Sequence, residues 1–278
     1  MGTLYLVATP IGNLEDITLR ALRVLKEATL IAAEDTRAAR KLLSHFEITK
    51  PITSYFEHNK IAKLETILNA LARGDVAVIS EAGTPGLSDP GYELVRAALA
   101  RDFRVVPIPG ANALTTALIA SGLPTDQFIF LGFLPRQKSA RRKFLQSVAD
   151  EPRTLIAYEA PHRVRTSLDD IAAALGNRAI CVARELTKLY EEFFRGTIEQ
   201  ARAHFAAHAP RGEFTFVIAG KTTDDRQQTT DQEWDGARVI AAVRELIAAG
   251  VARTDAVKRV ARESGRERRE VYQLAMNK

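Results

Sequence analysis

The chain has 278 residues, of which 46% are hydrophobic and 26% charged, and its formal net charge is +5. A domain usually holds roughly 100 to 150 residues, so we expect two main domains and a small tail. The composition excludes a disordered chain. No apolar run approaches the roughly 20 residues that cross a bilayer, and the apolar start carries no basic leader, so we expect a soluble cytoplasmic protein without a membrane partner.

The first third of the chain alternates short apolar runs with amphipathic stretches. This alternation is typical of βαβ units on a parallel sheet, so we expect an N-terminal α/β domain over residues 1–120. Thr18 opens the first helical stretch, where its hydroxyl suits a cap. The expected strands are Leu4–Ala8, Leu30–Ala33, Val76–Ser80 and Arg104–Ile108, and the expected helices are Thr18–Ala28, Leu64–Ala72, Tyr92–Ala100 and Asn112–Ala120.

The turn Ser121–Pro124 marks the expected domain boundary, because its glycine and proline end a helix before the next strand begins. The alternation then resumes less regularly, which indicates a mixed α/β domain over residues 124–220. The expected strands are Phe128–Gly132, Leu155–Tyr158, Ala179–Ala183 and Phe214–Ala219, and the expected helices are Ala140–Val148, Arg163–Leu175 and Ile198–His208.

Residues 221–233 contain no apolar side chain, so burial cannot offset the entropy of ordering them and we expect a flexible linker. Residues 234–278 form a separate tail. Three short helical patterns, Ala237–Ala248, Asp255–Arg262 and Glu267–Met276, are separated by glycine-containing breaks. Their spacing resembles a helix-turn-helix.

Several familiar chemical signatures are missing. The sequence has no Gly-x-x-x-x-Gly-Lys-Ser/Thr, and no Gly-x-Gly-x-x-Gly follows the first strand, which argues against ATP hydrolysis and ordinary dinucleotide binding. His204 and His208 have the spacing of zinc ligands, but the glutamate that follows the first histidine in zinc enzymes is absent. Cys181 is the single cysteine, so neither a disulfide nor a cysteine metal site can form. We expect no bound metal.

Four turns rich in glycine and proline follow predicted strands: Thr9–Asn13, Ala82–Gly86, Pro109–Asn112 and Glu159–His162. The carboxyl ends of strands in open α/β sheets are where ligands bind. The turns could be ordinary connections, but their shared placement favours a ligand held by backbone groups at one rim.

Seven motifs follow one another along residues 3–220: Leu6–Thr18, Ala33–Arg37, Ile79–Gly91, Pro109–Leu114, Gly132–Arg136, Glu159–Arg163 and Gly212–Gly220. They resemble those of the small-subunit ribosomal RNA methyltransferase I family, which belongs to the tetrapyrrole methylase superfamily. The first and third motifs are the most specific, and the tail resembles the helix-turn-helix extension of the same family.

The resemblance implies two α/β domains with S-adenosylmethionine in the cleft between them, and a homodimer. It also implies methylation of a cytidine ribose 2′-hydroxyl in the decoding region of 16S rRNA, so the partner is 16S rRNA or the small ribosomal subunit. The superfamily's cofactor contacts fall on Pro10, Ala82, Gly83, Thr84, Leu87, Asn112, Ala113, Glu159, Ala160, Arg184 and Thr215.

Transfer to a hydroxyl needs a proton acceptor, and RNA needs cations. The carboxylates that follow strands at the expected rim are candidates for the acceptor, and the sequence does not choose among them: Glu34, Asp35, Glu81 and Glu159. The candidate RNA contacts are Arg37, Arg40, Lys41, Arg136, Lys138, Arg141, Arg142 and Lys143, with Arg266, Arg268 and Arg269 in the tail.

Two other functions stay open. A tetrapyrrole methylase is one, although tetrapyrrole methylases usually carry Gly-Asp-Pro where this chain has Gly83-Thr84-Pro85. The other is a DNA-binding regulator that reads a duplex with the tail. Residues 231–278 hold ten Lys or Arg against eight Asp or Glu, which is weakly basic for an autonomous DNA binder.

Overall fold

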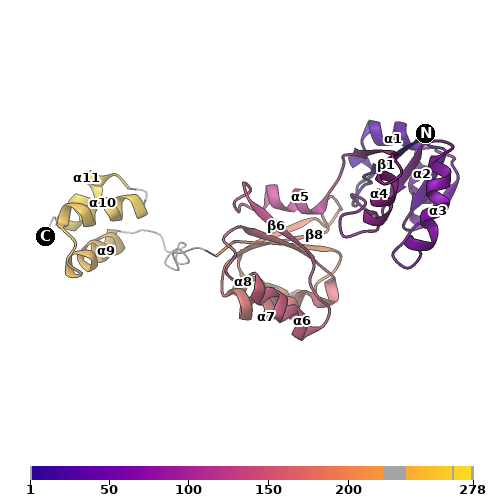
Figure 1. Cartoon of the computed structure of the whole chain (residues 1–278). Helices are drawn as coiled ribbons and strands as arrows, with labels where there is room; N and C mark the ends of the chain where they lie inside the picture. The colour runs from indigo at the N-terminus through magenta and orange to yellow at the C-terminus, as the bar shows by residue number, and fades with distance from the viewer. Residues whose placement is uncertain (1, 222–235, 265, 277–278) are drawn as a thin grey trace. The chain divides into compact units, whose positions relative to one another are not determined.

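The computed structural model describes residues 2–221, 236–264 and 266–276. The chain divides into two compact units, Met1–Thr222 and Thr223–Lys278. The first unit holds two five-stranded sheets with helices against them (Figure 1). The predicted fold class of two α/β domains with C-terminal helices is confirmed. The linker prediction lies outside the described residues except for Lys221.

The first sheet is wholly parallel, with strand order β3-β2-β4-β1-β5. Its central strand β4 is buried at every residue, as expected for a parallel strand covered on both faces. The short strand β3 was not among the predicted strands. The strands are β1 (Thr3–Val7), β2 (Leu30–Ala33), β3 (Ile52–Ser54), β4 (Val76–Ile79) and β5 (Arg104–Ile108).

Helices cover both faces of this sheet. Residues of α1 (Leu19–Glu27) and α2 (Thr36–His45) share one hydrophobic cluster with strand residues. Residues of α3 (Lys60–Leu71) and α4 (Tyr92–Leu99) share another. Thr18 caps α1 as predicted, with its hydroxyl accepting from the N–H of Ala21 at 3.0 Å. Sequence patterns did not predict α2 or the short 3-10 helix η1 (Leu14–Asp16).

The second sheet is mixed, with order β6-β7-β10-β8-β9. Strand β6 runs parallel to β7, and the other neighbours are antiparallel. The edge strand β9 was not predicted. The strands are β6 (Phe128–Phe133), β7 (Thr154–Glu159), β8 (Ala179–Arg184), β9 (Glu192–Thr197) and β10 (Phe214–Ile218).

Three helices pack on one face of the second sheet: α6 (Lys138–Ser147), α7 (Val164–Leu175) and α8 (Ile198–Ala207). The other face receives α5 (Ala113–Ala120), which directly follows the last strand of the first sheet (Figure 1). Ile11, from the loop after β1, joins Leu114 of α5 and Val217 of β10 in the same apolar cluster. The loops at the carboxyl edge of the first sheet are therefore packed against the second sheet.

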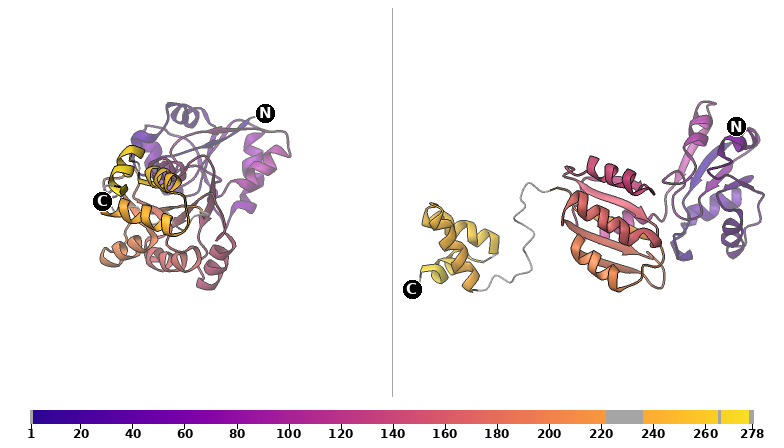
Figure 2. Two further views of the ribbon diagram at one scale, coloured as in Figure 1. Left: turned by 90° about the vertical axis from the view of Figure 1, so that its left-hand side faces the viewer. Right: turned by 90° about the horizontal axis from the view of Figure 1, so that it is seen from below.

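The C-terminal unit is a bundle of three helices, α9 (Gly236–Ala248), α10 (Arg253–Ser264) and α11 (Arg268–Met276). Figure 2 shows these helices packed against one another, and valines at positions 239, 243, 257, 260 and 271 form their core. In the described parts of the chain, no helix is both long and apolar enough to span a bilayer.

Candidate active site

A cavity of about 480 Å³ lies between the two sheets, at the carboxyl ends of β2, β4 and β7. Its size is typical of small-molecule sites. Loops after the strands supply most of the lining, as the four predicted turns indicated. The lining residues are Ile11, Glu34, Glu81, Ala82, Gly83, Thr84, Leu87, Ser88, Asp89, Asn112, Ala113, Phe133, Tyr158, Glu159, Ala160, Pro161, Glu213, Phe214 and Thr215.

The loops after β1 and β4 are joined by backbone hydrogen bonds. The N–H of Thr9 donates to the carbonyl of Gly83 at 2.8 Å, and the N–H of Gly83 donates back to Thr9 at 3.1 Å. Gly83 has φ of +82°, which only glycine adopts without strain, and a Cβ there would lie 3.2 Å from Ile11. This junction fixes backbone groups at the wall of the cavity.

The start of α5 connects the two halves of the cavity. The side chain of Asn112 accepts from the N–H of Leu114 at 3.0 Å and donates to the hydroxyl of Thr84 at 3.1 Å. The same N–H of Leu114 also donates to the hydroxyl of Tyr158 at 3.2 Å. Asn112 therefore caps α5 and links it to the loop after β4, while Tyr158 links it to the second sheet.

The side of the cavity that belongs to the first sheet carries carboxylates. Glu34 accepts from the N–H of Glu81 at 3.2 Å, and burial raises the pKa of Glu34. Burial also raises the pKa of Asp89, from 3.8 to about 7; the negative charges of Glu34 and Glu81 add to this rise and a hydrogen bond from Ser80 opposes it. Together these groups supply a carboxyl poised to exchange protons near neutral pH.

Glu159, on the side of the second sheet, has its carboxylate fully engaged. Ser167 donates to one oxygen. The N–H of Ala160 donates to the other at 2.9 Å, and the guanidinium of Arg163 lies 3.2 Å from that oxygen. Its side chain is 0% exposed. This carboxylate holds together the end of β7, the turn η2 (Pro161–Arg163) and α7.

Most of the predicted cofactor residues line the cavity, but Pro10 and Arg184 do not. Pro10 lines a neighbouring hollow of about 280 Å³, which also includes Lys41 and Glu81. Arg184 forms an ion pair with Glu192 at 3.2 Å.

Among the proton-acceptor candidates, Glu34, Glu81 and Glu159 line the cavity and Asp35 does not. Asp35 caps α2 and accepts from the N–H groups of Arg37 and Ala38 at 2.7 and 3.3 Å. The bond from Arg37 is the largest influence that lowers the pKa of Asp35. The carboxylate of Asp35 therefore caps α2 and does not line the cavity, so its inclusion among the candidate proton acceptors is corrected.

Sequence reasoning missed several lining residues, of which Asp89 and the aromatic pair Phe133 and Tyr158 are the most informative. Asp89 lies inside the third motif, Phe133 lies inside the fifth, and Tyr158 directly precedes the sixth. The two aromatic rings meet edge to face at 5.5 Å. Burial raises the pKa of Tyr158 to about 12, so its hydroxyl stays protonated at neutral pH. The other missed lining residues are Ile11, Ser88, Pro161, Glu213 and Phe214.

The predicted RNA-contacting cations differ in exposure. Arg141 is buried and pairs with Asp170 of α7 at 2.6 Å, with the two side chains 4% and 1% exposed. The assignment of Arg141 to an RNA-contacting surface was wrong, because its charge is used inside the domain. Arg142 also binds Asp170 but keeps its side chain 54% exposed. The other predicted cations of the first unit are exposed: Arg37, Arg40, Lys41, Arg136, Lys138 and Lys143.

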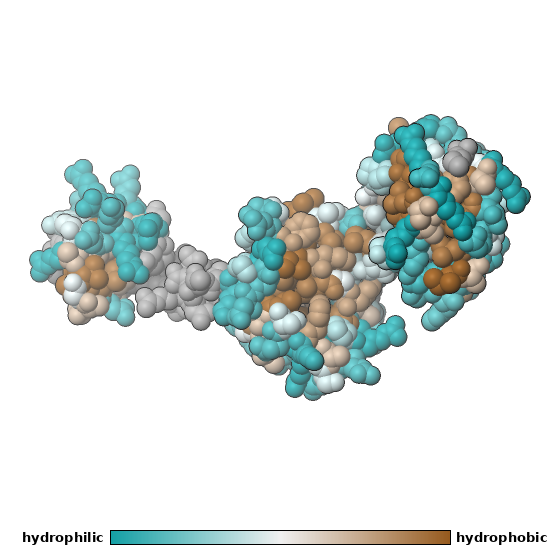
Figure 3. All heavy atoms as spheres, viewed as in Figure 1, coloured by the Kyte–Doolittle hydropathy of each residue, from teal (hydrophilic) through white to brown (hydrophobic). Residues whose placement is uncertain are grey.

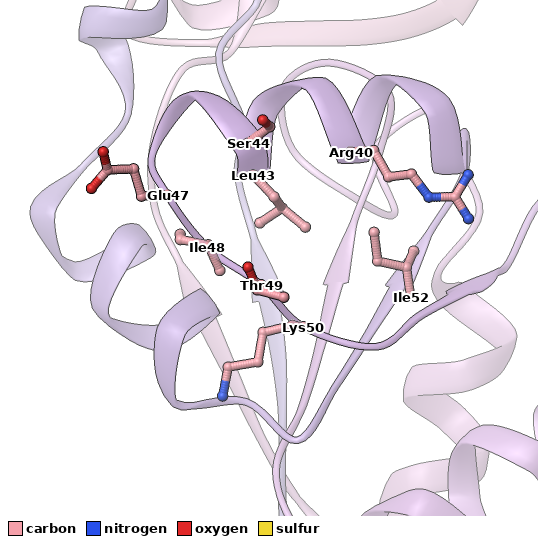
Figure 4. Close-up of a pocket in the computed structure, with 8 residues that line it drawn as sticks. All are labelled: Arg40, Leu43, Ser44, Glu47, Ile48, Thr49, Lys50 and Ile52. Atoms are coloured by element: carbon pink, nitrogen blue, oxygen red, sulfur yellow. The ribbon is translucent and has the colours of Figure 1, made fainter.

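A separate hollow of about 500 Å³ lies between the end of α2 and the start of β3. Figure 4 shows Arg40 and Lys50 at opposite ends of an apolar floor that includes Leu43 and Ile48, with the carboxylate of Glu47 directed away. This hollow is at the amino end of β3, opposite the edge where the strand-end loops gather. In the described residues, no group of three or more His, Cys, Asp or Glu side chains has the arrangement of a metal site.

Comparison with known proteins gives consistent matches. The family model "Tetrapyrrole (Corrin/Porphyrin) Methylases" matches residues 3–202. A ribosomal RNA small subunit methyltransferase I from Halalkalibacterium halodurans is 50% identical over 275 residues, which cover 98% of this chain and 94% of the relative. The corresponding protein from Synechocystis sp. is 49% identical, covering 99% of this chain and 98% of the relative.

Solved structures of two methyltransferases share the fold. A cobalt precorrin-4 methyltransferase aligns with a TM-score of 0.59 at 15% identity, covering 78% of this chain and 94% of its own. A uroporphyrin-III C-methyltransferase from Thermus thermophilus, complexed with S-adenosyl homocysteine, aligns with a TM-score of 0.53 at 21% identity, covering 79% of this chain and 98% of its own.

Proposed function

This chain belongs to the tetrapyrrole methylase family, and we propose that it methylates the ribose 2′-hydroxyl of a cytidine in the decoding region of 16S rRNA, with S-adenosylmethionine as the methyl donor. Its close relatives over nearly the whole chain are named small-subunit rRNA methyltransferases, which supports methylation of rRNA. The observation that carries the proposal is the cavity between the sheets, which combines a small-molecule volume with two carboxyl groups, Glu34 and Asp89, that pair with none of the described Lys or Arg residues.

The lining of the cavity fits S-adenosylmethionine. This ligand supplies a methyl group on a positively charged sulfur, and carboxylates such as Glu34 and Asp89 favour a nearby cation. Backbone groups of the loop after β4 and the side chains of Thr84 and Asn112 offer hydrogen bonds to its polar parts. The proposed cofactor contacts are Ala82, Gly83, Thr84, Leu87, Asn112, Ala113, Glu159, Ala160 and Thr215.

The protein's own contribution to the reaction is then positioning and proton removal. Holding two reactants at attack distance supplies roughly 7 to 11 kcal/mol of a barrier. The hydrogen bonds that join Thr9 to Gly83 and Asn112 to Thr84 make the walls of the cavity rigid enough for that task. A carboxylate on the first-sheet side removes the proton from the ribose hydroxyl.

Exposed cations support an RNA substrate. Lys41 of α2 lines the neighbouring hollow, which shares Glu81 with the cavity. Arg136, Lys138 and Lys143 form an exposed basic segment at the start of α6. Single-stranded RNA is usually bound through phosphate contacts while a nucleotide is splayed out into the enzyme. Arg268 and Arg269 of the tail are also exposed and extend the proposed contacts.

The lining of the cavity disfavours a tetrapyrrole substrate. Five carboxylates line it, from Glu34, Glu81, Asp89, Glu159 and Glu213, and none of the described Lys or Arg residues does. Glu34, Glu81 and Asp89, which pair with none of the described Lys or Arg residues, repel the several carboxylates of a tetrapyrrole precursor, whereas the ribose that receives the methyl group is itself uncharged. The replacement of the usual Gly-Asp-Pro by Gly83-Thr84-Pro85 argues in the same direction.

We also propose that the protein is a homodimer in the cytoplasm. Large hydrophobic side chains are exposed on α5 and β6, at Ile119, Phe128 and Phe133. Figure 3 shows hydrophobic atoms gathered on the surface of the second domain. An apolar patch of this kind supports contact with a second copy. Light scattering of the purified chain should give twice the monomer mass, and a monomer at micromolar concentration would contradict this part.

The function is tested in two steps. Calorimetry on the purified chain should detect binding of S-adenosylmethionine. Gly83→Ala should abolish this binding, because the added Cβ strains the backbone and crowds Ile11 at the wall of the cavity. Gly122→Ala is the matched control, because Gly122 has a similar φ of +80° with no atom within 4 Å of the added Cβ. Mass-spectrometric mapping should then find one cytidine 2′-O-methyl group in small-subunit RNA that is missing from cells without this gene. An unchanged methylation map would contradict the proposed substrate.

A further inference from the structure

We propose that Asp89 accepts the proton of the ribose hydroxyl and that Glu34 positions and tunes it for this role. The inference deepens the proposed function and rests on it. Asp89 is not among the cofactor contacts that the family resemblance implies. Its position in the cavity is visible only in the folded chain.

The loop between β4 and α4 is tightly folded, and its backbone is strained directly before Asp89. Gly86 has φ of +83°, and a Cβ on Gly91 would lie 2.9 Å from the Cα of Gly86, so the two ends of the loop touch. Ser88, directly before Asp89, has φ of +65°, which is unusual for a residue with a side chain. Strain of this kind persists where the surrounding structure enforces it, and it gathers at functional sites.

The other carboxylates near the cavity have competing roles. Glu159 is engaged by Ser167, Ala160 and Arg163. Glu213 lies 3.1 Å from the ammonium group of Lys188. Glu34 accepts from the backbone of Glu81 and so holds the loop after β4.

Glu81 and Asp89 remain, and they differ in exposure. Glu81 is exposed to solvent, whereas Asp89 is partly buried within the cavity. A base shielded from water and placed inside the cavity is the better acceptor for a bound hydroxyl.

The charges around Asp89 suit proton transfer at neutral pH. Glu34 at the end of β2, Glu81 after β4 and the hydroxyl of Tyr158 on β7 face it, and Ser80 donates a hydrogen bond to it. Burial, with the negative charges of Glu34 and Glu81, raises the pKa of Asp89 to about 7. Above that pH the carboxylate is ionised and able to accept a proton, and a proton acceptor works best when its pKa lies near the working pH.

The ribose oxygen forms a bond to the methyl carbon while the bond from sulfur to that carbon breaks, and its electron pair stays on sulfur. The proton of the hydroxyl passes to a carboxylate oxygen of Asp89, which becomes a neutral carboxylic acid. Asp89 returns the proton to water before the next turnover.

The first test is Asp89→Asn in the full-length chain, assayed with small ribosomal subunits. We expect kcat at pH 8 to fall by about 10² to 10⁴, the usual contribution of a general base. The KM for the subunit and the calorimetric affinity for S-adenosylmethionine should change less than threefold. Asp169→Asn, which removes a carboxylate that lies outside the lining of the cavity and pairs with Arg202 at the surface, should keep kcat within threefold. An Asp89→Asn variant with unchanged kcat would refute the inference alone, whereas a wild-type chain that neither binds the donor nor methylates would overturn the proposed function with it.

The second test measures tuning by Glu34. Removing the Glu34 charge by Glu34→Gln should lower the pKa of Asp89, so the acidic limb of the kcat profile should move to lower pH. Carbon-13 NMR of the Asp89 carboxyl in the protein alone should show the same shift without any assay of activity. If neither the acidic limb of the kcat profile nor the NMR titration of Asp89 shifts from its position in the wild type, the tuning role of Glu34 is refuted.

Discussion

The two sides of the cavity hold their carboxylates in opposite ways. On the side of the second sheet, the two oxygens of Glu159 take hydrogen bonds from Ser167 and Ala160 and lie beside Arg163. On the side of the first sheet, Glu34 and Asp89 have raised pKa values, and none of the described Lys or Arg residues lines the cavity beside them. A partnered carboxylate stabilises the fold, whereas one held beside other carboxylates is kept ready to take a proton.

The same contrast separates the cations of α6. Arg141 and Lys143 are two residues apart in a run of positive charge. Arg141 is buried against Asp170, and Lys143 is exposed. Charge in a sequence is therefore not equivalent to charge on a surface, and only the exposed members of the run are available to a phosphate backbone.

The largest effect is expected from breaking the buried pair. Asp170→Ala leaves the guanidinium of Arg141 buried without its carboxylate, which typically costs about 3 to 5 kcal/mol of stability. Urea unfolding should show this loss. Asp169→Ala is the matched control. Asp169 directly precedes Asp170 in the sequence, but its side chain is 54% exposed and pairs with Arg202 at the surface. Surface pairs contribute about 0 to 1 kcal/mol, so equal losses in the two variants would contradict the contrast.

A smaller effect is expected where the two sides meet, at the N–H of Leu114. This donor has two acceptors, Asn112 and Tyr158. Asn112→Ala should cost about 0.5 to 2 kcal/mol because α5 loses its cap. Tyr158→Phe alone should cost less, since Asn112 still accepts the bond.

The double variant should lose more stability than the sum of the two single changes, because the N–H is then left without either acceptor. Chemical denaturation of all four proteins measures this coupling. Additive losses would show that the two acceptors do not share the donor.

Sequence patterns predicted the fold well where a strand is marked by an apolar run in its own short segment of sequence. The apolar runs of β1, β2, β4 and β5 are continuous, and their strands lie within about one residue of the predicted bounds. The edge strand β9 was missed because Phe193 and Phe194 are its only large apolar residues, and it is ordered by pairing with β8. Strand pairing between distant segments is not visible in a local pattern.

The site was predictable as a set of loops but not as individual roles. Motifs identified Ala82, Gly83 and Asn112, which line the cavity. The raised pKa of Asp89 depends on Glu34, which another strand brings near. The burial of Arg141 likewise depends on Asp170 of α7. Roles that arise from contacts between distant segments need the folded chain.

The acidic side should also limit stability as pH rises. Folding raises the pKa of Asp89 from 3.8 to about 7, so the folded state binds a proton more tightly than the unfolded state. The stabilisation that Asp89 contributes is largest below pH 3.8 and decreases as pH rises toward 7. Above about pH 7 this contribution is lost, and it changes no further. Asp89→Asn should therefore match the wild type near pH 4 and be the more stable protein at pH 8. Melting temperatures across this range test the sign, and a variant that is less stable at pH 8 would contradict it.

The smallest effect per residue is expected at the exposed basic segment. Replacing Arg136, Lys138 and Lys143 with Ala should weaken binding to small-subunit RNA only several-fold. It should also reduce the slope of log affinity against log salt concentration by about 2, since each phosphate contact on a single strand contributes about 0.7. The control with the same change in net charge replaces three exposed cations of α1, Arg20, Arg23 and Lys26. Fluorescence titrations at several salt concentrations give the slope of log affinity against log salt concentration for both variants. Equal slopes would mean that total charge, rather than this segment, attracts the RNA. A reduced slope confined to the α6 variant would identify the segment as the contact.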